Sequence, residues 1–148
     1  MPQTVNSVLA DMTIVVDPDE YQLIKLSPKG IMAAAAIVAE LADPFIALIA
    51  DSDEVTLILE MEAYEEYAHR LIGHVHEAST YRLITFDLTL EPTLTGFMAI
   101  LAKSLAEVNV PILPLAAYSR DHVLVPSALL DTAIAALTQL QTSARNML

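Results

Sequence analysis

The sequence predicts an α+β fold of two tandem units, each with an antiparallel sheet and helices on one face. Three observations predict it. A short apolar segment occurs twice, as Tyr21-Gln-Leu-Ile-Lys-Leu26 and as Tyr81-Arg-Leu-Ile-Thr-Phe86. Each copy leads to a glycine that opens an apolar helix pattern, Gly30-Ile-Met-Ala33 and Gly96-Phe-Met-Ala99. Each copy then continues with two closely spaced apolar runs and a second helix pattern, which gives the order strand, helix, strand, strand, helix.

In the second copy, a β-rich strand is expected over Tyr81–Thr89, followed by a turn at Glu91–Thr95 whose threonines suit a helix N-cap. The next helix carries its apolar stripe at three- and four-residue steps and ends at Asn109-Val-Pro111; the stripe consists of Phe97, Leu101, Leu105 and Val108. Two strands, Ile112–Tyr118 and His122–Val125, are close enough to form an antiparallel hairpin. Ser127 then caps a final helix.

The first copy repeats this order. Its expected elements are a strand over Tyr21–Leu26, a helix over Gly30–Leu41, strands over Phe45–Ala50 and Val55–Leu59, and a helix over Ala63–Ile72. An extra strand, Met12–Val16, precedes them. The predicted division is therefore a first unit over residues 1–78, with the extra N-terminal strand, and a second unit over residues 79–148.

Charge and composition narrow the function classes. The 148-residue chain has a net charge of −12, and residues 1–76 hold 13 acidic against 3 basic residues. A surface of that sign repels phosphate backbones and anionic lipids, so nucleic-acid and membrane partners are not expected. The chain has no cysteine and no basic residue in its first ten positions, which fits a cytoplasmic protein without a secretory signal. Glu40, Asp43 and Pro44 interrupt the most apolar region, so no membrane span is expected.

Three segments of the second copy carry a resemblance to a known family. These segments are Tyr81-Arg-Leu-Ile-Thr-Phe-Asp-Leu88, Leu94-Thr-Gly-Phe97 and the run from Ile112 to Val125. They resemble the ACT domain in its aspartokinase-like, CASTOR-type variant. The first copy resembles it more weakly. The whole chain is similar to short bacterial proteins with two ACT units, no catalytic domain and no assigned function. The resemblance implies ferredoxin-like βαββαβ units with sheets paired side by side. It also implies small effectors, usually amino acids, at the seam between units, with no cofactor and no enzyme activity from the fold itself.

The residues themselves predict a ligand site in the second copy. Gly96 opens a helix, so the backbone N–H groups of Thr95, Gly96 and Phe97 are expected to face a ligand carboxylate. The turn opposite supplies a hydroxyl, a cation and an anion from Ser119, Arg120 and Asp121, and Asp121 suits a ligand ammonium group. The alternative is that Gly96 only permits close helix packing and that Ser119 and Asp121 only satisfy a hairpin turn.

The first copy departs from this pattern. Its helix entrance is Ser27-Pro-Lys-Gly30 and its turn is Ala50-Asp-Ser-Asp-Glu54, without an arginine, so a second equivalent site is not predicted. Lys29 is either an anion ligand or simply solvated. The acidic turn lacks the spacing of a calcium loop and is interpreted as a charged surface turn.

Histidine is the other residue type to weigh. His69, His74 and His76 lie close in sequence, but nothing nearby marks a third fixed metal ligand, so no metal site is predicted. His122 follows the candidate site turn and is either a pH-sensing or ligand-contacting residue or an ordinary strand-edge histidine.

No sequence motif supports catalysis, because the chain has 3 glycines and neither a phosphate-binding loop nor a nucleophile elbow. The leading hypothesis is a regulatory sensor module that binds a small-molecule effector, an amino acid, at the seam between its units. Binding would then alter contact with a second copy in a homodimer or with a regulatory protein partner. The alternative is a ligand-free dimerisation or scaffold module in which Phe97, Met98 and Tyr118 fill the seam.

Overall fold

The computed structural model describes residues 2–41 and 45–148. Asp43 and Pro44, which are expected to interrupt the most apolar region, therefore lie outside the described residues. The chain forms two compact units. One, here called the discontinuous unit, consists of Met1–Pro18 and Arg82–Leu148. The other, here called the central unit, consists of Asp19–Tyr81. The predicted division at residues 78 and 79 follows the sequence repeat, whereas the structure groups the first 18 residues with the second copy.

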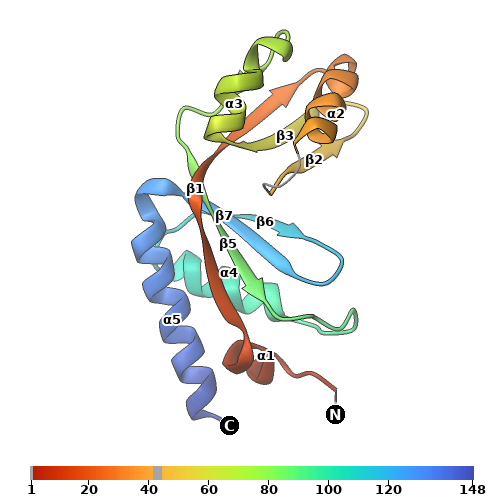
Figure 1. The fold of residues 1–148 in the computed structure, drawn as a ribbon. Coiled ribbons are helices and arrows are strands. Elements are labelled where there is room, and N and C mark those ends of the chain that lie inside the picture. The colour runs from red at the N-terminus through yellow and green to blue at the C-terminus, as the bar shows by residue number, and fades with distance from the viewer. Residues whose placement is uncertain (1, 42–44) are drawn as a thin grey trace. The chain divides into compact units, whose positions relative to one another are not determined.

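The discontinuous unit contains a four-stranded sheet with two long helices (Figure 1). Its elements in chain order are α1 (Val5–Asp11), the first part of β1 (Thr13–Leu26), β5 (Tyr81–Asp87), α4 (Phe97–Glu107), β6 (Leu113–Ala116), β7 (Asp121–Pro126) and α5 (Leu130–Asn146). The strand order is β1-β5-β7-β6. The predicted hairpin is confirmed, because β6 and β7 pair antiparallel, with Leu113 opposite Leu124 and Ala116 opposite Asp121.

One apolar core holds this unit together. Alternate residues of the central strands β5 and β7 face the helices and contribute to this core. The buried strand residues are Ile84, Phe86, Val123 and Val125, and the helices add Phe97, Leu101, Leu105, Ala133 and Leu137. Phe97, the first residue of α4, packs edge-on against Phe86 with ring centroids 5.8 Å apart. This contact fixes the start of α4 against the sheet.

The N-terminal helix α1 was not predicted from the sequence. Thr4 caps its start, and its end is closed by side chains from α5, far away in the chain. The amide of Gln141, which is buried, donates to the carbonyl oxygens of Leu9 and Met12 at 3.1 and 2.6 Å. Arg145 donates to the carbonyl oxygen of Ala10 at 3.0 Å. A helix this short depends on such tertiary contacts, which a local pattern does not reveal.

The prediction of two separate N-terminal strands, Met12–Val16 and Tyr21–Leu26, is wrong. Both belong to β1, which continues through Asp17 and Pro18 as one strand from Thr13 to Leu26. Arg82 supports this passage by donating to the carbonyl oxygen of Asp17 at 2.9 Å. The first part of β1 gives the discontinuous unit its fourth strand, which completes a ferredoxin-like set of four strands and two long helices.

The central unit has the same order of elements. The second part of β1 is followed by α2 (Ile31–Glu40), β2 (Ala47–Ala50), β3 (Val55–Glu60), α3 (Met61–Tyr67) and the two-residue strand β4 (Val75–His76). The strand order is β2-β3-β1, and β4 also pairs with β1. The predicted α+β fold with antiparallel sheets is confirmed, although β4 was not predicted and the predicted helix over Ala63–Ile72 is α3 plus a 3₁₀ turn over Ala68–Arg70.

The core of the central unit also lies between one sheet face and the helices. Its buried residues are Ile24, Leu26, Ala34, Ile37, Val55, Leu57, Leu59, Ala63 and Leu71. Within the described part of the chain, no helix is both long and apolar enough to cross a membrane.

Replacing Gln141 with leucine is expected to lower the free energy of unfolding by about 1–3 kcal/mol, because two buried carbonyl oxygens at the end of α1 lose their donor. Denaturant unfolding followed by circular dichroism measures the change. Gln139→Leu, at an exposed position of the same helix, is the control and should change stability little. Equal stability of Gln141→Leu and the parent protein would contradict the capping role of this side chain.

Candidate functional site

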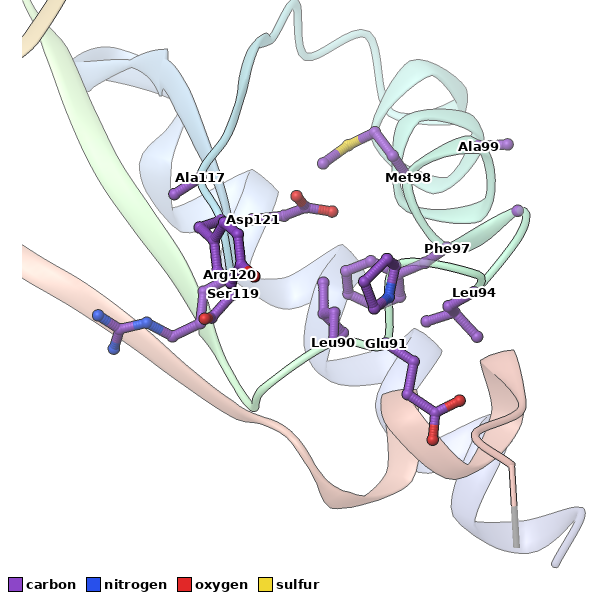
Figure 2. A pocket seen from close by; sticks show the side chains of 13 residues that line it. Leu90, Glu91, Leu94, Phe97, Met98, Ala99, Ala117, Ser119, Arg120 and Asp121 are labelled. Atoms are coloured by element: carbon purple, nitrogen blue, oxygen red, sulfur yellow. The ribbon is translucent and has the colours of Figure 1, made fainter.

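A pocket of about 330 Å³ lies in the discontinuous unit, where the loop between β5 and α4 faces the turn between β6 and β7 (Figure 2). Five of the six residues predicted for the ligand site line it: Gly96, Phe97, Ser119, Arg120 and Asp121. The loop and α4 add Leu90, Glu91, Pro92, Leu94, Met98 and Ala99, and the hairpin adds Ala117 and Tyr118. Every lining residue therefore comes from the second copy of the repeat.

Two hydrogen-bonded links hold the loop and the turn in place. The backbone N–H of Leu90 donates to the carbonyl oxygen of Ser119 at 2.8 Å, which joins the two walls directly. From the N-terminal segment, Gln3 accepts from the N–H of Glu91 at 2.7 Å and donates to the carbonyl oxygen of Thr89 at 2.7 Å. The pocket rim is thus fixed by contacts from three distant parts of the chain.

Gly96 is required by its backbone conformation. Its φ is 92°, in the left-handed region that side-chain-bearing residues rarely adopt. A Cβ atom placed there would meet only Val5, at 4.0 Å, so close packing does not explain this glycine. The packing interpretation applies instead to Gly30 of the first copy, where a Cβ atom would lie 2.9 Å from the Cβ atom of Leu26. The two glycines occupy equivalent positions for different physical reasons.

The start of α4 offers hydrogen-bond donors to the pocket. Gly96 is its N-cap, and no described side chain caps it. The first intrahelical bond runs from the N–H of Ile100 to the carbonyl oxygen of Gly96 at 3.1 Å, so the N–H groups of Phe97, Met98 and Ala99 precede the first internal donor. These groups carry the partial positive charge of the helix N-terminus. An anionic ligand group is favoured beside them.

Asp121 supplies the opposite charge. It is the first residue of β7, and Figure 2 shows its carboxylate pointing into the gap toward Met98. Within the described residues, no hydrogen bond or ion pair is made by this carboxylate. Partial burial raises its pKa above the ordinary value of 3.8, and the positive charge of His122 opposes that rise. The pocket therefore contains a half-buried acid without a partner cation.

Arg120 does not point into the pocket as predicted. Its Nη1 atom lies 3.0 Å from Oδ1 of Asp87, on β5, and Figure 2 shows the side chain extending away from the pocket. Both side chains of this ion pair are about half exposed. The cation expected to contribute to the site is thus already paired with a neighbouring acid.

The remaining predicted residues have different places. Thr95 is exposed, its hydroxyl donates to the carbonyl oxygen of Thr93 at 3.2 Å, and it does not line the pocket. The ring of Phe97 is buried in the core, so only its backbone is placed to bind a ligand.

Some lining residues were not among the predicted site residues. Of these, Met98 had a visible signal in the sequence, because Gly-x-Met-Ala recurs in both copies. Leu90, Leu94 and Ala117 gave no local signal, because only the tertiary fold brings them together.

The acidic turn of the first copy is stabilised by hydrogen bonds between its own residues. Oδ1 of Asp51 accepts from the backbone N–H groups of Asp53 and Glu54 at 2.8 and 2.9 Å, and these bonds lower the pKa of Asp51. Lys29 lies at a hollow of about 300 Å³ that Arg70 also lines, but Arg70 is paired with Glu40 at 2.8 Å. Asp51 and Arg70 are therefore engaged with protein partners.

Among the histidines, His74 shares a 3.0 Å hydrogen bond with the hydroxyl of Tyr64, and its Nδ1 lies 2.8 Å from the carbonyl oxygen of Leu71. Nδ1 of His76 lies 2.8 Å from the carbonyl oxygen of Glu77. Within residues 2–41 and 45–148, no three acidic or histidine side chains are arranged to hold a metal ion. His122 is buried, and its Nδ1 lies 2.8 Å from the hydroxyl of Thr85. Its pKa is lowered, mainly by burial and secondly by the positive charge of Arg120.

Comparison with known proteins identifies the second copy. Residues 78–139 match the family model described as the ACT domain. This range includes every residue that lines the pocket. No match was found among curated proteins.

Solved structures share the fold over nearly the whole chain. A protein of unknown function from Vibrio cholerae, described as a possible transport protein, is 22% identical with a TM-score of 0.72, covering 93% of this chain and 96% of its own. The ligand-free regulatory subunit of aspartate kinase from Thermus thermophilus is 16% identical with a TM-score of 0.68, covering 86% and 97%. A putative C-terminal regulatory domain of aspartate kinase from Porphyromonas gingivalis is 15% identical with a TM-score of 0.64, covering 88% and 96%.

At these identities the likeness to solved structures establishes the fold alone. The chain therefore shares the fold of these proteins over most of its length, and its residues 78–139 are similar to the ACT domain.

Proposed function

We propose that this chain is a non-catalytic regulatory module that binds a free amino acid, or a similar zwitterion, in the pocket between the start of α4 and the β6–β7 turn. One observation carries the proposal: an uncapped helix N-terminus and a carboxylate without a partner face the same hollow. The first complements a ligand carboxylate and the second complements a ligand ammonium group.

A zwitterion fits these two groups better than a single charge does. A simple anion would gain the helix N-terminus but would approach the carboxylate of Asp121. A simple cation would gain Asp121 but would leave the N–H groups of the first turn unused. An α-amino acid presents both charges on one carbon atom and therefore complements both walls of the pocket together.

The regulatory part of the proposal is supported by the kind of protein that shares this fold. The solved structures from Thermus thermophilus and Porphyromonas gingivalis are regulatory parts of an enzyme and carry no catalytic role in their descriptions. A ligand that contacts both α4 and β7 would constrain the spacing between the helix start and the turn. That constraint would shift contact with a second copy or with a regulatory partner. All residues of this pocket belong to one unit, and the predicted location at the seam between units and the cytoplasmic setting stay predictions.

The alternative, a ligand-free scaffold, requires the pocket to be filled by the protein's own side chains. The three residues named for that role differ in burial and do not fill the pocket jointly. The ring of Phe97 is buried in the core, Met98 is half-buried, and Tyr118 is 100% exposed. The hollow of about 330 Å³ beside them favours a ligand over a plug.

A thermal-shift screen of the purified protein against the twenty amino acids is expected to give a saturable rise in Tm with one or a few of them. A ligand bound only by the native state at 100 times its Kd stabilises it by about 2.7 kcal/mol. Nucleotides and metal ions in the same screen serve as controls and should give no shift. Absence of any shift with amino acids, in protein shown to be free of carried-over ligand, would contradict the proposed function.

Asp121→Asn is expected to abolish most of the ligand response while raising the Tm of the unliganded protein at neutral pH. The loss of one charged hydrogen bond, about 1.5–3 kcal/mol, weakens binding roughly 10- to 100-fold. The gain in unliganded Tm follows from the raised pKa of Asp121. An acid with a raised folded-state pKa destabilises the folded state at pH values above that pKa, and this cost disappears as the pH falls below 3.8.

Melting curves between pH 3 and pH 8, with and without the amino acid, test both effects. Glu107→Gln removes an equal charge from an exposed position on α4 and is the matched control. The difference between Asp121→Asn and the parent should vanish below pH 3.8, whereas Glu107→Gln should retain the full ligand response. If Asp121→Asn binds the amino acid as tightly as the parent does, Asp121 is not the ammonium anchor.

A further inference from the structure

We infer that the pocket selects amino acids with an uncharged, apolar side chain, and that Met98 is the residue that contacts this side chain. The inference rests on the proposed function and adds a substrate class to it.

The charged residues of the pocket leave nothing to complement a charged ligand side chain. Asp121 is assigned to the ammonium group. The guanidinium group of Arg120 is paired with Asp87 at 3.0 Å and extends away from the pocket (Figure 2). The carboxylate of Glu91 also points away in Figure 2, and it lies 3.3 Å from the backbone N–H of Gln3.

An acidic or basic ligand side chain is therefore disfavoured. A ligand carboxylate would have no free cation among the described lining residues and would share the pocket with Asp121. A second ligand ammonium group would compete with the first one for a single carboxylate. In either case a charge would leave water without a partner, which is unfavourable even in an open pocket.

The other side chains of the pocket are apolar, except for those of Tyr118 and Ser119. Leu90, Leu94 and Met98 are half-buried and pack against the core cluster of the unit. Ala117 adds a methyl group from the hairpin. A ligand that is anchored by its ammonium group on Asp121 and by its carboxylate on the start of α4 has these side chains as its remaining neighbours. Burial of an apolar ligand side chain against them is favourable, because it removes apolar surface from water.

Met98 is placed to contact the side chain of the ligand. Its side chain and the carboxylate of Asp121 point toward one another across the gap (Figure 2). It is unbranched and flexible, so it can adapt to ligand side chains of different shapes. The backbone N–H of the same residue belongs to the first turn of α4, so the carboxylate contact and the side-chain contact are coupled through one residue.

The size of the pocket agrees with a single amino acid. Its volume, about 330 Å³, lies at the lower end of the range of ligand pockets, roughly 300–1,000 Å³. Larger molecules such as nucleotides would extend beyond it into solvent. Leucine, isoleucine, valine and methionine therefore fit the observations best.

Isothermal titration calorimetry of the parent protein with leucine, isoleucine, valine, methionine, aspartate, glutamate, lysine and arginine tests the selectivity. We expect the best apolar amino acid to bind at least tenfold more tightly than any of the four charged ones. A charged amino acid that binds as tightly as the best apolar one would overturn this inference and leave the proposed function standing. Binding of none of these eight, together with no thermal shift with any of the twenty amino acids, would contradict the proposed function itself.

Two substitutions test the role of Met98. Met98→Ala should weaken the binding of the best large apolar amino acid at least fivefold and that of alanine less. Met98→Lys should weaken apolar ligands and improve the relative affinity for aspartate and glutamate, because it adds the missing cation. Met32 is the equivalent residue of the first copy and is 78% exposed, so Met32→Ala and Met32→Lys are matched controls that should leave all affinities unchanged.

Unliganded melting curves show whether each variant is folded. Unchanged affinities in folded Met98→Ala and Met98→Lys would overturn the assignment of Met98. Equal effects at Met32 and Met98 would also overturn it, because the change would then not depend on the pocket.

Discussion

The left-handed backbone at Gly96 is the constraint on which the arrangement of the site depends. With a φ of 92°, this residue ends the loop after β5 and begins α4 at the pocket rim. It allows the ring of Phe97 to turn into the core, against Phe86, while the backbone N–H groups of the first turn remain at the surface. A side chain at residue 96 would strain this junction even though the space around it is open. The same junction therefore anchors the helix and exposes its donors.

The second constraint is electrostatic. Asp121 remains half-buried without a partner cation, although Arg120 is its neighbour in the chain, because Arg120 reaches Asp87 on the adjacent strand. An unsatisfied acid lowers the stability of the unliganded protein, which is the usual sign of a group kept for binding. In the first copy the equivalent turn is different, since Asp51 binds the backbone of its own turn. The two copies thus share a fold but differ in what their turns offer a ligand.

The repeat, the two hairpins and the starts of α2 and α4 could be predicted from the sequence because they depend on local patterns and on glycine. The continuity of β1 could not, because Asp17, Pro18 and Asp19 have the composition of a loop and are held extended by tertiary contacts. The helix α1 was missed because its end is capped by Gln141 from the other end of the chain. The pairing of Arg120 could not be predicted because its acidic partner, Asp87, comes from a different strand.

The most direct test of the zwitterion site is an NMR titration of the isotope-labelled protein with leucine, following the backbone amide signals. Saturable shifts are expected for Phe97, Met98 and Ala99, at the start of α4, together with residues next to Asp121. The amides of Ile31, Met32 and Ala33, at the equivalent helix start of the first copy, should stay unchanged. Saturable binding that leaves the first turn of α4 unperturbed would contradict the site, because the ligand carboxylate would then be held elsewhere.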